Sequence, residues 1–235
     1  LRVDAMRPRW SILAALLLLA AACSGSVAAG GDAGSTGAGD DETNDASCGP
    51  GCIVPQGFVL ATMGPGPSSP TTVCHFGIAQ SWLMVGAPTP SIPDVVQDGG
   101  SQNGAPVAVA CSVIPVNAGF DVSLQISVGG TGGGGLTITS PAGVGAVTMA
   151  GAQGITASWQ SETFGPASES DCTIAFTYEG QPVYDDPPVA AGRIWGHLSC
   201  PQALFDGETV VGPDGGTTTV HCDGEADFLF EQCTE

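Results

Sequence analysis

Apolar and polar residues alternate most regularly in the middle of the chain. In GFDVSLQISV (residues 119–128) every second residue is apolar, from Phe120 to Val128. Strict alternation with a period of two is typical of a β-strand that buries one face. The preceding PVAVACSVI (106–114) also predicts a strand, and VNAG supplies the turn residues between the two segments. Together they predict an antiparallel β-hairpin.

Further short apolar runs flank this hairpin, and Gly and Pro residues separate them. Two runs lie within residues 71–85, and no amphipathic helical pattern follows the N-terminal segment. We expect additional β-type segments at residues 136–140, 145–149, 154–159, 172–179, 192–200, 217–222 and 226–233. Many short strands with Gly/Pro turns predict an all-β fold, a disulfide-stapled antiparallel β-sandwich, with an Ig-like arrangement or an open barrel as variants.

One cysteine pairing follows from side-chain parity. In CTIAFTY (172–178) and RIWGHLSC (193–200), one set of alternate positions is largely apolar and includes a cysteine. An antiparallel register that places Ile174 opposite Leu198 puts both apolar sets on one face. The same register pairs Tyr178 with Ile194, Phe176 with Gly196, and Cys172 with Cys200. We therefore predict a Cys172–Cys200 disulfide.

The N-terminal segment has the organisation of a secretory signal. MRPRWSILAALLLLAAAC (6–23) contains two arginines, then an apolar run, then small residues before Cys23. An apolar run of about a dozen residues is too short for a permanent membrane helix, which needs about 20. We expect a start at Met6, a signal peptide covering residues 1–22, and export of the remaining chain.

The end of this signal resembles the lipobox of bacterial lipoproteins, whose cysteine receives the lipid. The matching residues are Ala20-Ala21-Ala22-Cys23, followed by Ser24, although such boxes usually have leucine where Ala20 stands. The resemblance implies lipid attachment at Cys23. Through Ser24 it implies an outer-membrane location, on the periplasmic face or at the cell surface. The alternative is an ordinary signal cleaved nearby, which leaves Cys23 as a free thiol.

Residues 23–47 differ in composition from the rest of the chain. They are rich in Gly, Ala, Ser and Asp and have almost no side chains that could build a core. Such a segment is expected to be a flexible tether for the lipid-modified end. CGPGC (48–52) then begins the folded region as a local staple, and we expect one β domain over residues 48–235.

The charge balance of the chain is strongly acidic. It has no lysine, four arginines and 23 acidic residues, which give a formal net charge of −19. Three arginines precede Cys23, so Arg193 alone follows it. Nucleic-acid binding depends on Lys and Arg at phosphates, and anionic headgroups repel acidic proteins. We therefore expect no nucleic-acid partner, and membrane attachment through the N-terminal lipid.

Eight cysteines follow Cys23, which indicates a set of disulfides in an exported chain. The chain resembles the mycobacterial 19 kDa lipoprotein antigens in its lipobox and its tether. The resemblance extends to the segment DGGSQNGAPVAVACSV…FDVSLQISVGG within residues 98–139 and to the terminal ADFLFEQC. That resemblance implies a small β domain with a Cys111–Cys233 disulfide and no catalytic residues. GRIWGHLSC and CDGEADFLFEQC also resemble exported lipoproteins of unknown function in high-GC bacteria. The partners of the remaining cysteines stay open: Cys48, Cys52, Cys74 and Cys222.

Motifs that would indicate catalysis or metal binding are weak. The chain has no G-x-S-x-G, H-E-x-x-H or P-loop motif, and its lone G-x-G-x-x-G (130–135) precedes a β-branched run rather than a helix. The Cys-His neighbours at 74–75 and 221–222 would point to opposite faces of a strand, so we expect no zinc site. We expect no cofactor. An irregular Ca²⁺ site in the acidic segments 206–214 or 223–227 is the alternative.

The candidate ligand face is the polar side of residues 192–200, which carries Arg193, Trp195 and His197. The leading hypothesis is a non-catalytic, lipid-anchored lipoprotein of the cell envelope. Its role would be structural, adhesive or ligand-binding, with an unidentified surface ligand or protein partner.

Two alternatives belong to other functional classes. The first is a carbohydrate- or lipid-binding module that uses exposed Trp159 or Trp195, or an apolar cavity in the sandwich. The second is a glycan hydrolase that uses carboxylates such as Asp185 and Asp186. Adjacent carboxylates on one loop do not provide the opposed acid and nucleophile of such enzymes, so this alternative is disfavoured.

Overall fold

The structure is a computed structural model that describes residues 53–182, 187–211 and 215–235. The expected signal peptide, the lipid-attachment residue Cys23, the tether, the staple at residues 48–52, and Asp185 and Asp186 lie outside the described residues. Among the residues that it describes, no helix has the length and hydropathy required to cross a membrane.

The regular elements of the described chain are β-strands. Their bounds are β1 (Gln56–Gly64), β2 (Gln80–Val85), β3 (Val96–Gln97), β4 (Ser101–Gln102), β5 (Ala105–Val116), β6 (Gly119–Val128), β7 (Gly134–Thr139), β8 (Ala152–Ser161), β9 (Ala167–Ala175), β10 (Thr177–Tyr178), β11 (Gln181–Pro182), β12 (Val189–Ala190), β13 (Arg193–Val211) and β14 (Thr217–Glu231).

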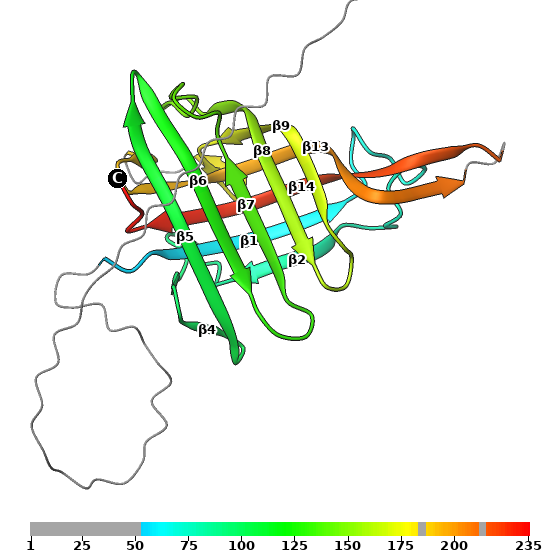
Figure 1. Cartoon of the computed structure of the whole chain (residues 1–235), viewed down its shortest axis with the longest axis horizontal. Helices are drawn as coiled ribbons and strands as arrows, with labels where there is room; N and C mark the ends of the chain where they lie inside the picture. The colour runs from blue at the N-terminus through cyan, green and yellow to red at the C-terminus, as the bar shows by residue number, and fades with distance from the viewer. Residues whose placement is uncertain (1–52, 183–186, 212–214) are drawn as a thin grey trace, which may run out of the picture. The chain divides into compact units, whose positions relative to one another are not determined.

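Most strands belong to one antiparallel sheet, in the order β2-β1-β14-β13-β9-β8-β7-β6-β5-β4. The sheet folds over itself, so that β5, β6, β7 and β8 cross in front of β2, β1, β14 and β13 (Figure 1). We call these four-strand groups the front layer and the back layer. β9 pairs with both β8 and β13 and thereby carries the hydrogen bonding from one layer to the other. The predicted all-β antiparallel fold is confirmed, as two crossing layers of a nearly closed, barrel-like sheet.

The outer edge of β5 is covered by other parts of the chain. Near its start, the N–H of Val107 donates to the carbonyl of Gly100, and the N–H of Val109 donates to Oδ1 of Asp98, each at 2.8 Å. Near its end, the N–H of Val113 donates to the carbonyl of Thr234 at 2.9 Å, next to the Cys111–Cys233 disulfide. An uncovered edge strand would be a template for pairing with other chains. Here the C-terminal residues occupy that position.

The core lies between the two layers and is built from the alternate residues that face inward. Its largest fully buried side chains include Trp159 from β8 and Phe228 and Phe230 from β14. The indole of Trp159 packs directly on the backbone of Gly224, where a Cβ atom would lie 2.8 Å from Cζ2 of the ring. Gly224 thus provides the space in the back layer that the tryptophan fills.

The predicted hairpin and register are confirmed in part. β5 and β6 pair continuously around a turn at Asn117, which has a positive φ of 54°. β9 and β13 pair Ile174 with Leu198, as the parity argument requires. The register does not extend to Tyr178, which pairs with Gln181 in a separate small hairpin. β9 ends at Ala175, and the following residues turn onto the outer face of the back layer.

Several other sequence-based boundaries were wrong. Residues 145–149 form isolated bridges rather than a strand, and residues 217–222 and 226–233 contribute to one strand, β14. Of residues 71–85, those that form a strand are Gln80–Val85. The sequence reasoning also missed β1, because Phe58 is buried on the outer face and the strand therefore lacks a simple alternation of apolar and polar residues.

Three disulfides lie within the described residues. Cys172–Cys200 links β9 to β13 and Cys111–Cys233 links β5 to the C-terminal residues, as the sequence analysis proposed. Cys74–Cys222, whose pairing the sequence left open, fastens the segment before β2 to β14. The sequence separations are 28, 122 and 148 residues respectively.

Removing these bonds is expected to destabilise the domain according to the length of chain that each one closes. By the chain-entropy relation, replacing both cysteines of Cys111–Cys233 with serine should cost about 5 kcal/mol, and the same change at Cys172–Cys200 about 3.5 kcal/mol. The free energy of unfolding from urea titrations measures both values. A larger loss at Cys172–Cys200 would contradict this order.

Filling the space beneath Trp159 should also destabilise the core. Gly224→Ala is expected to lower the free energy of unfolding by about 1–3 kcal/mol, because the new methyl group forces the indole or β14 to shift. Gly77→Ala is the matched control, since a Cβ atom there has no atom within 4 Å. Equal urea midpoints for the two variants would show that the Trp159 contact is not tight.

Candidate functional site

The outer face of the back layer carries the three residues that the sequence proposed as a ligand face. Arg193 lies with its Nε 3.2 Å from Oε1 of Glu231. Trp195 is only 3% exposed, because the ring of Tyr178 stacks on it with the ring centroids 6.4 Å apart. Trp159 is fully buried in the core. The expectation that Trp159 and Trp195 are exposed was therefore wrong, and neither indole face is open to a ligand.

His197 remains partly exposed on this face and forms an ion pair across two strands. It lies directly opposite Asp227 of β14, and Nδ1 of the imidazole is 2.9 Å from Oδ1 of the carboxylate. This hydrogen bond is the main cause that raises the pKa of His197 above its ordinary value. Burial acts in the opposite direction, and the charges of Asp227 and Glu225 raise the pKa further. The imidazolium form is thus stabilised in the folded protein.

Other acidic side chains hold loops in place. The carboxylate of Asp223 accepts hydrogen bonds from the backbone N–H of Ser68 at 3.1 Å and of Gln202 at 3.3 Å. Asp121 accepts the backbone N–H groups of Gly143 and Gly145, and these bonds lower the pKa of its carboxyl. These carboxylates therefore have structural partners.

Several side chains of the metal alternatives have other partners, and residues 212–214 of the acidic segment 206–214 lie outside the described residues. The cysteines of the Cys-His neighbours are joined to each other as Cys74–Cys222, and Nδ1 of His75 lies 3.2 Å from Oε2 of Glu208. Within the described ranges, no group of three or more His, Cys, Asp or Glu side chains is arranged to hold a metal ion.

A regular array of uncharged polar side chains covers the outer face of the front layer. Directly paired residues of an antiparallel sheet project from the same face, so the registers of β6, β7 and β8 define three rows of three. We call these nine positions the hydroxyl–amide grid. Its rows are Ser123, Thr139 and Thr156; Gln125, Thr137 and Ser158; and Ser127, Gly135 and Gln160.

The grid differs from the rest of this acidic chain in charge and in hydrogen bonding. Eight positions carry a hydroxyl or an amide, the ninth is Gly135, and none is charged. In the described part of the chain, none of these eight side chains donates or accepts an intramolecular hydrogen bond. The outer face of the back layer, in contrast, presents the charged groups Arg193, Asp227 and Glu231. The donors and acceptors of the grid are therefore directed to solvent.

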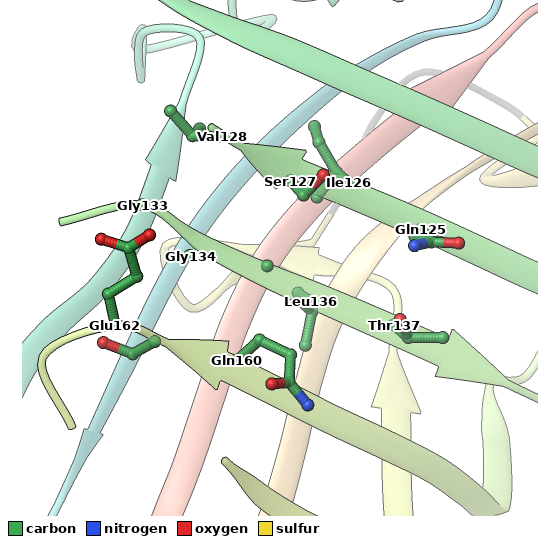
Figure 2. A pocket seen from close by; sticks show the side chains of 12 residues that line it. Gln125, Ile126, Ser127, Val128, Gly133, Gly134, Leu136, Thr137, Gln160 and Glu162 are labelled. Atoms are coloured by element: carbon green, nitrogen blue, oxygen red, sulfur yellow. The ribbon is translucent and has the colours of Figure 1, made fainter. Parts of the chain in front are cut away.

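The missing side chain at Gly135 opens a hollow in the grid. This hollow has a volume of about 310 Å³, and its floor is the glycine segment 133–135. A Cβ atom on Gly135 would lie 3.3 Å from the carbonyl oxygen of Ile126 and 3.3 Å from Cβ of Ser127, so a side chain here would be crowded against β6. Figure 2 shows Gln125, Thr137 and Gln160 projecting from three neighbouring strands around it.

One carboxylate marks the end of the hollow. Glu162, just after β8, lies beside Gly133 in Figure 2. Its Oε2 accepts a hydrogen bond of 2.8 Å from the N–H of Gly132. This bond fixes the β6–β7 loop against the β8–β9 loop. The carboxylate still has a second oxygen to offer as an acceptor.

A second hollow continues the same surface toward β13. It has a volume of about 410 Å³ and shares Ser158 and Gln160 with the grid. Ser168 of β9 and Leu204 of β13 extend the middle row, because Ser158 pairs with Ser168 and Ser168 pairs with Leu204. The two hollows thus lie side by side and share Gln160 as a lining residue.

Sequence reasoning missed the grid, although its signal was present. The polar positions of residues 119–128 after Asp121 are Ser123, Gln125 and Ser127, with no charge among them. The same uncharged pattern recurs at Thr137 and Thr139. Each run alone indicates an ordinary solvated strand face. Only the register of the sheet brings the runs together into one surface.

Comparisons with known proteins add no relatives to this description. No family model, no curated protein and no solved structure matches the chain.

The His197–Asp227 pair generates a prediction about pH. Because the pKa of His197 is raised in the folded state, its stabilising contribution is complete below the unfolded pKa, about 6.5. The contribution is lost as the pH rises through the folded pKa. We expect Asp227→Asn to lower the pKa of His197, measured by NMR of the imidazole, and to flatten the decline in unfolding free energy over this pH window.

Asp223→Asn is the matched control for this measurement. Asp223 lies on the same strand, but its carboxylate contacts the backbone of Ser68 and Gln202. The pKa of His197 should stay near the wild-type value in this variant. A similar pKa in wild type and Asp227→Asn would show that the pair does not hold the imidazolium.

Proposed function

We propose that this chain is a non-catalytic, lipid-anchored lipoprotein of the cell envelope whose β domain binds a ligand through the outer face of its front layer. The observation that carries the proposal is the hydroxyl–amide grid with the hollow at Gly135. It concentrates hydrogen-bonding groups that have no partners within the described residues. Ligand sites are usually concave, and convergent polar groups within them fix the orientation of the ligand.

The anchor and the location rest on the sequence. The basic start, the apolar run and the small residues before Cys23 support export, and the lipobox resemblance supports acylation of Cys23. Ser24 supports the outer membrane as the destination. The three disulfides are in keeping with an oxidising compartment. The chain then attaches to the membrane through its lipid alone, because an acidic protein is repelled by anionic headgroups. Binding to nucleic acid is disfavoured for the same reason.

A binding role is favoured over catalysis by the surroundings of the histidines. Within the described residues, no hydroxyl or thiol side chain is hydrogen-bonded to the ring of His197, so the His197–Asp227 pair has no nucleophile to activate. The adjacent carboxylates Asp185 and Asp186 of the hydrolase alternative lie outside the described residues. Lipid binding inside the sandwich is disfavoured because Trp159, Phe228 and Phe230 fill the interior.

Intact mass spectrometry on the protein from native membranes tests the anchor. The expected mass begins at Cys23, includes acyl chains, and increases on reduction by two hydrogens for each disulfide. Cys23→Ala should remove the acyl mass and release the protein into the soluble fraction, whereas Ser26→Ala should stay with the membrane. An unlipidated wild-type chain beginning at another residue would make this an ordinary secreted protein.

A further inference from the structure

We propose that the hydroxyl–amide grid is a binding site for a neutral, polyhydroxylated ligand, namely an uncharged oligosaccharide or polysaccharide segment lying across β6, β7 and β8. This inference rests on the proposed binding function and names the chemical class of its ligand. The groups that would contact the saccharide are Gln125, Thr137 and Gln160 around the hollow, with Glu162 at its end.

The type of hydrogen-bonding group selects the ligand. Hydroxyls and primary amides both donate and accept, and eight of the nine grid positions carry one of them. A sugar presents hydroxyls that likewise donate and accept, so each can be satisfied by one grid side chain. An apolar ligand would desolvate these groups without replacing their bonds to water, which is costly.

The charge distribution disfavours anionic ligands at this surface and places no carboxylate within the grid. The chain has a formal net charge of −19, which repels anions. Cations would be drawn to carboxylates, which lie at the margins of this surface, Glu162 at the rim of the first hollow and Asp206 in the second, and not at the nine grid positions. Glu162, at the rim, can accept hydrogen bonds from the hydroxyls of a sugar as well as from Gly132. A neutral ligand is therefore the one that this part of the surface fits.

The position of the grid within the sheet disfavours an extended peptide. Peptides that add a strand need a free sheet edge. The backbones of β6, β7 and β8 are paired on both sides, so the grid offers side chains alone.

The dimensions of the grid fit a linear saccharide. Neighbouring strands are about 4.8 Å apart, close to the repeat of one pyranose unit along an extended chain. The hollow at Gly135 admits part of a ring below the level of the surrounding side chains, and the second hollow lies beside it at Ser158 and Gln160.

NMR titration of the folded domain tests this assignment. The probes are neutral cello-, malto-, manno- and xylo-oligosaccharides, with oligogalacturonate as the acidic comparison. We expect at least one neutral series to shift amide signals of residues 123–139 and 156–162, and oligogalacturonate to leave them unchanged. Absence of shifts with every neutral series, or equal shifts with the acidic one, would overturn the inference.

Paired variants locate the binding. Thr137→Val with Gln160→Leu keeps the approximate size of both side chains but removes the groups that would hydrogen-bond to the saccharide, and should weaken saccharide binding about tenfold. Thr173→Val with Gln153→Leu makes the same chemical changes at exposed positions of β9 and β8 outside the grid. This control pair should bind like wild type. Equal loss in both pairs would place the saccharide elsewhere.

The outcomes also separate this inference from the proposed function. If the lipidated protein is isolated from native membranes with a non-saccharide ligand, the proposed binding role in the envelope stands and the saccharide assignment is wrong. If the domain binds a saccharide but Cys23 carries no lipid, the binding site stands and the proposed lipid anchor is wrong.

Discussion

The hydrogen bonds along the outer edge of β5 are the interaction on which the rest of the β domain depends. β5 lies near one end of a long antiparallel sheet, and without partners its edge would expose a row of donors and acceptors. The backbone of Thr234 and the Cys111–Cys233 bond attach this edge to the C-terminal end of the chain. This attachment holds the front layer across the back layer. The core between the layers can then exclude water, and its buried side chains support the strands of the grid from behind.

Much of the fold could be predicted where one strand face is apolar and the other polar. Residues 119–128 show this pattern without interruption, and their pairing with β5 follows from the short turn at Asn117. β1 could not be found in the same way. Its residue Phe58 contacts the ring of Tyr178 on the outer face, with centroids 6.1 Å apart, so both faces of the strand are partly apolar. A strand buried on two sides loses the period of two that reveals it.

The candidate site was much less predictable than the fold. Trp195 was attractive from sequence because its parity places it on the outer face, and that parity is correct. What the parity could not show is that Tyr178, after the end of β9, returns to cover it. The grid could not be predicted from the sequence for the opposite reason. Neutral polar residues such as Gln125 and Thr137 have no distinctive meaning in one strand, and their importance arises from neighbours that are distant in sequence.

The pairing of β1 with β14 has a consequence for the order in which the domain can fold. These are the first and last long strands of the described chain, and Gln56 bonds to Glu231 across 175 residues. Contacts so distant in sequence form late, since the whole intervening chain must be available before they can close. The back layer therefore cannot be completed before β14 is available, whereas the pairs β5–β6, β6–β7 and β7–β8 join strands that are adjacent in sequence. A chain with this topology can form its front layer first and close its back layer last.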